Sequence, residues 1–294
     1  MIIINKRNLF FLISVWLLST LLSAQNVTIS TPHTQLLLSV PNGGTPEQLY
    51  YGSRTSDADI RSICETARRR NAYPVYGMGY PCETALSVRH ADGNLTLQMA
   101  VIGVKETRLT KENATLTVIE LKDKVYPFFV NICYKAWQDA DVIETWTEIR
   151  HEEKKPVILS KYASSMLHLN SSKYFLTEFS GDWAHEANVT ERELAFGKKV
   201  IDTKLGARAN MFVSPFFQLA LDNPSQENAG EVLVGTIGWT GNFRFTFEVD
   251  NKNELRIISG INPYDSEYSL PAKEVFRTPD FYFTYSTQGK GEAS

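Results

Sequence analysis

The chain has 294 residues, of which 43% are hydrophobic and 12% aromatic, and its formal net charge at pH 7 is −3. That length can bury one large all-β core or the cores of two ordinary domains. A mildly acidic chain without a basic stripe is not expected to bind nucleic acid, because such binding requires clustered Lys and Arg.

The first 24 residues match the pattern of a secretory signal peptide. Lys6 and Arg7 form a short basic start, residues 9–22 form an apolar run, and the small residues Ser23 and Ala24 follow. This order is typical of a signal that is removed on export. A retained membrane anchor is the alternative, but the run is shorter than the ~20 residues that a spanning helix needs. We therefore expect cleavage after Ala24, a periplasmic or secreted protein, and no membrane contact after cleavage.

Residues 56–70 have the periodicity of one short helix. An apolar stripe at positions i, i+3, i+4 and i+7 is formed by Ile60, Ile63, Cys64 and Ala67. Ser56, with Asp59 three residues later, predicts a capping box at the start. The basic triplet of residues 68–70 complements the negative end of the helix dipole. A solvated helix end is therefore a plainer interpretation of these residues than a site for an anionic ligand.

Most of the remaining chain up to residue 288 alternates between apolar and polar side chains. The alternation is clearest in residues 95–101, 243–249 and 281–285. A period of two places one set of side chains on one face, so these segments are predicted to be strands with one buried side. Turn residues such as Asp92-Gly93 and Asn223-Pro224 separate the strands. The pattern favours an all-β fold of antiparallel sheets packed as a sandwich. Residues 289–294 are predicted to begin a linker rather than to fold.

The three cysteines leave one unpaired in an oxidising compartment. Cys64 and Cys82 are close enough in sequence for a bridge that would contribute roughly 3 kcal/mol. A buried free thiol on the apolar stripe is the alternative for Cys64. Cys133 lies in the alternating segment 128–134 and is predicted to be a free thiol. The spacing fits no zinc site, the five histidines form no close pair, and we expect no metal and no cofactor.

No familiar nucleophile motif is present in the sequence. G-x-S-x-G, H-E-x-x-H and the P-loop are all missing. Carboxylates are plentiful, but the pair that glycoside hydrolysis requires cannot be chosen from sequence alone. Trp183 stands out because it lies in a polar stretch, between Asp182 and Glu186. Such a side chain either stacks on a sugar ring or fills the edge of a sandwich core, and the residues alone do not decide between the two.

Several segments together resemble motifs of glycoside hydrolase family 36 α-galactosidases, and they keep the family's order over residues 27–289. In chain order they are Leu49-Tyr50-Tyr51-Gly52, Tyr73-Pro74-Val75-Tyr76-Gly77, residues 139–143, Gly181-Asp182-Trp183-Ala184-His185-Glu186, Gly206-Ala207-Arg208 with Pro215-Phe216-Phe217, Gly238-Trp239-Thr240-Gly241-Asn242-Phe243, Gly260-Ile261-Asn262-Pro263, and Tyr285-Ser286-Thr287-Gln288-Gly289. Tyr51, Arg208 and Ser214 depart from the family's pattern.

The resemblance implies that residues 25–288 form the family's N-terminal domain, a large antiparallel β-supersandwich of the galactose-mutarotase type. In the family a (β/α)₈ barrel follows and carries the catalytic aspartates in K-x-D-x-N and G-G-x-R-x-D motifs. Neither motif occurs in this sequence. We therefore expect no catalytic residue in this chain, no α-galactosidase activity of the chain alone, and a need for the barrel in cis or in trans.

The resemblance also implies which residues meet galactose. Trp183 matches the family's sugar-facing Trp, and Asp59 or Asp57 stands where an Asp after the L-Y-W-G strand is expected. Because this chain supplies only one wall of the site, its binding of a galactose-containing saccharide should be weak. The resemblance also implies a homo-oligomer. The competing hypothesis is a free-standing secreted module that binds carbohydrate or mediates oligomerisation without belonging to an enzyme.

Overall fold

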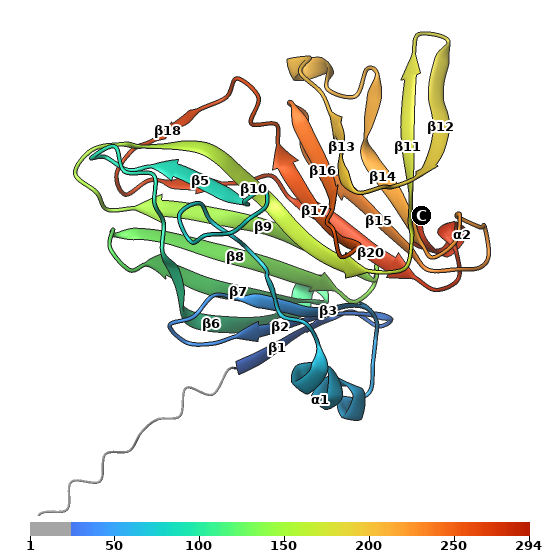
Figure 1. Ribbon diagram of the computed structural model, residues 1–294, viewed down its shortest axis with the longest axis horizontal. Helices are drawn as coiled ribbons and strands as arrows, with labels where there is room; N and C mark the ends of the chain where they lie inside the picture. The colour runs from blue at the N-terminus through green and yellow to red at the C-terminus, as the bar shows by residue number, and fades with distance from the viewer. Residues whose placement is uncertain (1–24) are drawn as a thin grey trace, which may run out of the picture.

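The computed structural model describes residues 25–294, and these form an almost entirely antiparallel β structure in three sheets (Figure 1). The predicted signal peptide lies outside the described residues. In residues 25–294, no helix is long and apolar enough to cross a membrane.

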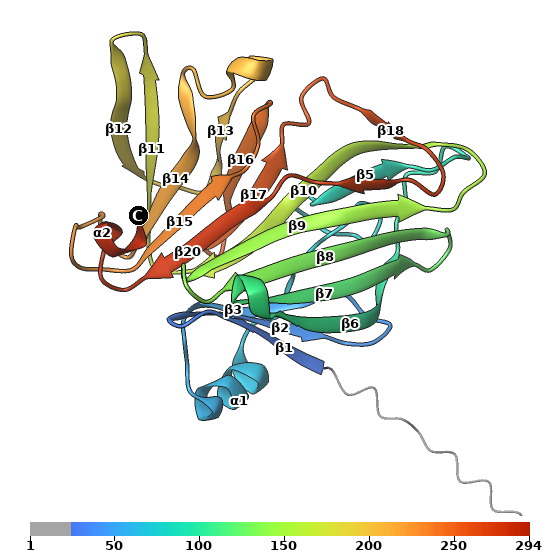
Figure 2. The same ribbon diagram turned by 180° about the vertical axis from the view of Figure 1, so that it is seen from behind.

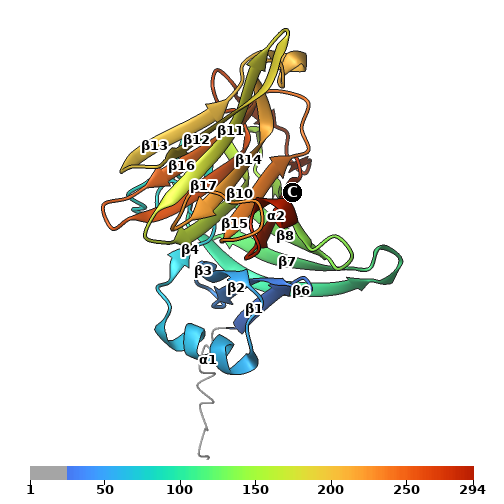
Figure 3. The same ribbon diagram turned by 90° about the vertical axis from the view of Figure 1, so that its right-hand side faces the viewer.

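The first sheet has four strands and contains the N-terminal part of the fold. Its order is β1 (Gln25–Ser30), β2 (Thr34–Val40), β3 (Glu47–Ser53) and β4 (Arg70–Asn71). Helix α1 (Asp57–Thr66) connects β3 to β4 and projects from one end of the molecule (Figure 3).

The second sheet has ten strands and spans the whole molecule (Figure 2). Its order is β12 (His185–Glu193), β11 (Tyr174–Asp182), β14 (Val213–Leu221), β15 (Val232–Ile237), β20 (Phe281–Ser286), β9 (Val142–His151), β8 (Phe128–Trp137), β7 (Ala114–Asp123) and β6 (Met99–Leu109), with β19 (Val275–Arg277) also paired to β9. A 3₁₀ turn, η1 (Thr110–Glu112), joins β6 to β7.

The third sheet has six strands and packs on the second. Its order is β13 (Gly197–Asp202), β16 (Phe243–Val249), β17 (Glu254–Ile261), β10 (Val157–Asn170) and β18 (Tyr268–Leu270), and β5 (Leu86–Arg89) pairs with β10. A second 3₁₀ turn, η2 (Gly206–Arg208), connects β13 to β14, and α2 (Lys290–Ala293) follows β20.

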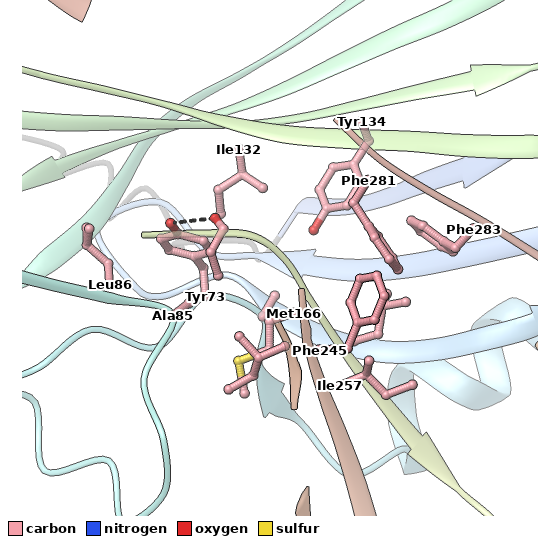
Figure 4. Close-up of a cluster of buried hydrophobic side chains, with 14 of the residues drawn as sticks. Tyr73, Ala85, Leu86, Ile132, Tyr134, Met166, Phe245, Ile257, Phe281 and Phe283 are labelled. Carbon is pink, nitrogen blue, oxygen red and sulfur yellow. Dashed lines mark hydrogen bonds between the residues drawn. The ribbon is translucent and has the colours of Figure 1, made fainter. Parts of the chain in front are cut away.

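The three sheets share one continuous apolar core, which contains Val27 of the first sheet, Phe283 of the second and Ile257 of the third. Phe245, Phe281 and their neighbours fill its centre (Figure 4). The alternation in residues 243–249 and 281–285 therefore predicted buried strand faces correctly, and the predicted all-β antiparallel sandwich is confirmed. The segment 95–101 is different, because its strand begins only at Met99; Leu97 is buried without a ladder partner.

The predicted helix is confirmed, but it is shorter than 56–70. Ser56 and Asp59 form the predicted capping box, and the helix ends at Thr66. None of its residues is buried, so the stripe that holds Cys64 is not a core-facing stripe. The basic triplet lies beyond the helix, where Arg68 and Arg70 form ion pairs with Glu254 at 2.6 and 2.9 Å.

The chain terminus is folded, which corrects the expectation of a linker at residues 289–294. Gly289 adopts a φ of 84° and its N–H donates to the carbonyl of Gly230 at 2.9 Å. The next residues form α2, whose Ala293 is buried against Val232 and Val234 of β15. An apolar patch on the outer face of the ten-stranded sheet thus anchors this segment, although its Gly and charged residues had suggested no folded structure.

The cysteines are not bridged in the structure. Cys64 and Cys82 are free and half-buried, and Cys133 is a free, buried thiol on β8, as predicted. Burial raises the pKa of the Cys133 thiol to about 12, so this group stays a neutral thiol at physiological pH.

Candidate functional site

The hairpin of β11 and β12 presents Trp183 at its tip (Figure 1). Gly181 makes the tight turn possible, because a Cβ at this position would lie 2.6 Å from the carbonyl oxygen of His185. Ala184 and Ala187 adopt positive φ angles of 61° and 55°, which reverse the chain and place a bulge in β12. The turn therefore depends on backbone geometry rather than on core packing.

The Trp183 side chain is 87% exposed. Its backbone N–H donates to the carboxylate of Asp182 at 2.7 Å, and the N–H of Ala184 donates to Glu186 at 3.2 Å. The two carboxylates thus hold the turn while the indole stays free. Such exposure excludes the alternative that Trp183 fills the edge of the core.

Four loops meet at this end of the molecule: residues 181–186, 203–212, 238–242 and 262–264. We call them together the hairpin end. The N–H of Gly181 donates to the carbonyl of Phe212 at 3.0 Å. Asn242 links the other loops, since its side chain accepts from Gly206 at 2.7 Å and its carbonyl accepts from Asn262 at 3.0 Å. Segments far apart in sequence are therefore held as one surface.

The hairpin end exposes more large apolar side chains than Trp183 alone. Phe212 is 44% exposed, Trp239 40% and Tyr264 64%. Trp239 lies over Gly241, where a Cβ would come within 2.6 Å of its indole nitrogen. Packing thus accounts for the position of Trp239 only in part. Several exposed aromatic residues at one end of a domain are typical of a binding surface.

The structure does not bring Asp57 and Asp59 close to Trp183. Both aspartates lie at the start of α1, at the opposite end of the molecule from the hairpin (Figure 3). Asp59 is engaged in the capping box, where its carboxylate accepts from the Ser56 hydroxyl at 2.7 Å. Within one chain, these aspartates and Trp183 cannot contact the same sugar ring.

The other two tryptophans of residues 25–294, Trp137 and Trp146, lie on the outer face of the ten-stranded sheet. Trp146 is buried, and the guanidinium of Arg277 covers its ring at 4.5 Å. Trp137 lies under the ammonium of Lys135 at 3.8 Å and donates to Glu144 at 2.8 Å. Neither presents a free ring face comparable with that of Trp183.

A second hollow, which sequence reasoning missed, lies between β3 and the β14–β15–β20 part of the large sheet. It has a volume of ≈ 380 Å³ and is lined by Tyr50, Asn170, Glu231 and Tyr285 among others. We call it the Tyr50 cleft. Tyr50 and Tyr285 belong to segments that carried the family resemblance, whereas Glu231 had no sequence signal because its neighbours in the cleft are distant in the chain.

Across residues 25–294, no group of three or more His, Cys, Asp and Glu side chains could hold a metal ion. The largest charged cluster outside the two surfaces is centred on Glu83, which forms ion pairs with Lys161 at 2.5 Å and Lys198 at 3.0 Å. Burial alone would raise the pKa of Glu83, but these two lysines and Arg244 lower it to about 2. This cluster ties the loop before β5 to β10 and β13, and its charges are already neutralised.

The chain is similar to known proteins over most of its length. The model of the glycosyl hydrolase family 36 N-terminal domain matches residues 44–271. Alpha-galactosidase Mel36A of Lactobacillus acidophilus is 25% identical over 88% of this chain, and alpha-galactosidase 2 of Pediococcus pentosaceus is 30% identical over 60% of it. The crystal structure of the alpha-galactosidase AgaA A355E of Geobacillus stearothermophilus shares the fold, with a TM-score of 0.84 over 92% of this chain at 21% identity.

These similarities cover only part of each relative. The match spans 39% of Mel36A, 24% of the Pediococcus protein and 42% of the AgaA chain. The residues 44–271 that match the family model nevertheless include most of the chain described above, with the β11–β12 hairpin and all four loops of the hairpin end complete. The chain belongs to the glycosyl hydrolase family 36 N-terminal domain family.

Proposed function

We propose that this chain is the non-catalytic N-terminal domain of an exported α-galactosidase, and that its hairpin end forms one wall of the galactose site. The activity assigned to the complete protein is the hydrolysis of terminal α-galactosides in oligosaccharides and polysaccharides. The relatives named above are α-galactosidases, and AgaA structures of the same fold hold raffinose or stachyose. The signal pattern of residues 1–24 supports export.

The exposure of Trp183 is the observation that carries this proposal. An indole held at a hairpin tip by backbone geometry can cover the apolar face of a sugar ring without cost to the core. The same position matches the sugar-facing Trp that the family resemblance implied. Asp57 and Asp59, at the far end, take no part in this wall within one chain; they would reach a galactose site only in another subunit of an oligomer.

Hydrolysis requires two carboxyl groups on either side of the glycosidic bond. At the hairpin end, Asp182 and Glu186 both bond to the backbone of the turn that carries Trp183. They hold the turn rather than face each other across a substrate. We therefore assign the chemistry to the barrel and only positioning to this chain.

An activity assay tests the assignment. The purified chain is expected to release no aglycone from an aryl α-galactoside. A chimera that joins residues 25–294 to the barrel of Mel36A is expected to be active, and Trp183→Ala in the chimera should raise KM at least tenfold. Turnover by the isolated chain that persists through repurification and disappears with one substitution in it would contradict the proposal.

A free-standing carbohydrate-binding or oligomerisation module is the second candidate, and the exposed Phe212 and Tyr264 favour it. These side chains are available on the isolated domain. Size-exclusion chromatography with light scattering separates the two candidates. An isolated chain that forms a stable oligomer through the hairpin end, and an inactive chimera, would together favour the module over the enzyme domain.

A further inference from the structure

The walls of the Tyr50 cleft are built by fixed aromatic rings. The hydroxyl of Tyr50 donates to the carbonyl of Ser53 at 2.8 Å, which sets the direction of its ring. Gly52 leaves the space for this ring, since a Cβ there would lie 2.7 Å from the Tyr50 hydroxyl oxygen. On the opposite wall Tyr285 is buried and packs edge-on against Tyr51, with ring centroids 6.0 Å apart. The two rings are therefore preorganised.

Glu231 adds an exposed carboxylate to the lining of the cleft. In the part of the chain that the structure describes, no Lys, Arg or His forms an ion pair with the Glu231 carboxylate. Burial raises the pKa of Tyr50 and that of Tyr285, and the charge of Glu231 raises both further. Glu231 and both tyrosines line the same cleft. The backbone of Glu231 is anchored, because its carbonyl accepts from the N–H of Leu221 at 2.9 Å.

The charges that line the cleft balance one another. Arg68 and Arg70 line the cleft, but both are held by Glu254. The floor is neutral: burial lowers the pKa of His168 to about 4, so its imidazole is uncharged at neutral pH. Asn170 adds an amide that can donate and accept hydrogen bonds. The two guanidiniums share the single carboxylate of Glu254, so together with Glu231 the lining of the cleft carries no net charge, which favours a neutral ligand over an anion or a cation.

We propose that the Tyr50 cleft binds one neutral pyranose ring, with Tyr50 against its C–H face and Glu231 accepting hydrogen bonds from two adjacent hydroxyls. A cleft of this volume is in the range that holds small ligands. A carboxylate is the strongest acceptor for a vicinal diol, and a tyrosine ring covers the apolar side of a sugar. The cleft is separate from the hairpin end, so this site does not depend on the role proposed for Trp183.

The test is a titration of the ¹⁵N-labelled chain with methyl α-D-galactopyranoside and methyl α-D-glucopyranoside, followed by NMR. At least one of the two glycosides is expected to shift the amides of residues 49–52 and 231 in a saturable way. Glu231→Gln, which keeps the size and removes the charge, should weaken this binding at least tenfold, and Tyr50→Leu should abolish it. Glu274→Gln, an exposed carboxylate outside the cleft, is the matched control and should leave the affinity unchanged.

Three outcomes would overturn the site: no shift at these amides with either sugar, an unchanged affinity in Glu231→Gln, or shifts produced by methylammonium instead of sugar. The last outcome would identify a cation site. Thermal melts of each variant verify that the fold is intact, and Glu231→Gln alone decides the test if Tyr50→Leu is unfolded. Failure of this site and failure of the Trp183 wall are distinguishable, since Trp183→Ala affects only signals of the hairpin end.

Discussion

Trp183 and Trp146 show how differently one side-chain type can be used in this domain. Trp183 is exposed and contacts mainly its own turn, whereas Trp146 is 8% exposed. The indole nitrogen of Trp146 donates to Glu148 at 3.2 Å, and Arg277 covers the ring. Burial, not residue type, therefore separates a side chain available for a ligand from one that stabilises the fold.

Alanine substitutions should reflect this difference. Trp183→Ala is expected to change the free energy of unfolding by less than about 0.5 kcal/mol, as for an exposed surface position. Trp146→Ala should cost about 3 kcal/mol, because a large buried ring is removed and Arg277 loses its partner. Urea unfolding of both variants is the measurement. A larger loss for Trp183→Ala than for Trp146→Ala would show that the hairpin tip is part of the packed structure.

His168 makes the stability of the domain dependent on pH. Because its ring is buried, the charged imidazolium is disfavoured and the pKa of His168 falls to about 4. A hydrogen bond to the carbonyl of Asn71 at 2.9 Å opposes this shift. In the unfolded chain a histidine has a pKa of about 6.5, so the unfolded state binds the proton first as the pH falls. Stability is thus highest above pH 6.5 and decreases as the pH falls toward 4.

We expect this histidine to account for a loss of up to about 3 kcal/mol between pH 7 and pH 4. The measurement is urea unfolding at a series of pH values for the parent chain and for His168→Gln. The variant should show a shallower decrease in this range. His185→Gln, at the exposed hairpin tip, is the control, and a pH dependence that is equal in all three proteins would contradict the assignment.

At the scale of elements, the tip of the β11–β12 hairpin is stabilised by its own turn and by one neighbouring loop. β12 is an edge strand whose side chains are nearly all exposed. Its partner β11 is hydrogen-bonded to β14 on the other side. A strand with as few buried side chains as β12 opens more readily than core strands, whereas β11 buries Tyr174 and Leu176. The position of Trp183 therefore depends on local geometry, and most of all on Gly181.

Gly181→Ala should loosen the hairpin without unfolding the domain. The new Cβ would collide with backbone atoms of residues 185 and 186, which cannot rotate away as a side chain can. We expect the amides of residues 181–188 to exchange hydrogen at least tenfold faster, with a global loss below about 1 kcal/mol. Gly103→Ala on β6 is the control, since its Cβ would meet only the flexible carboxylate of Glu120. Unchanged exchange in the hairpin would contradict the role assigned to Gly181.

At the scale of the whole molecule, the sequence predicted local features better than distant ones. The capping box of Ser56 and Asp59 and the strand that holds Cys133 depend on residues within a few positions of each other, and both are confirmed. The fold class followed from the period of two, and its detailed form from the family resemblance. The separation of Asp59 from Trp183 could not be predicted, because it is set by how three sheets pack together.

The same reason explains the other differences between prediction and structure. The Tyr50 cleft joins β3, the end of β10 and the residue before β15, so no short segment signals the part played by Glu231. The docking of α2 depends on an apolar patch formed by Val232 and Val234, more than fifty residues earlier in the chain.

The central claim is that the hairpin end of this domain faces galactose through Trp183. The most direct measurement is a galactose titration followed through the indole N–H signal of Trp183 in ¹⁵N-labelled protein, with Trp183→Ala used to assign the signal. We predict a saturable shift of this signal with a Kd in the millimolar range, about −4 kcal/mol, and loss of the accompanying amide shifts at residues 181–186 in the variant. An indole signal that does not move with galactose, or hairpin shifts that persist in Trp183→Ala, would contradict the claim.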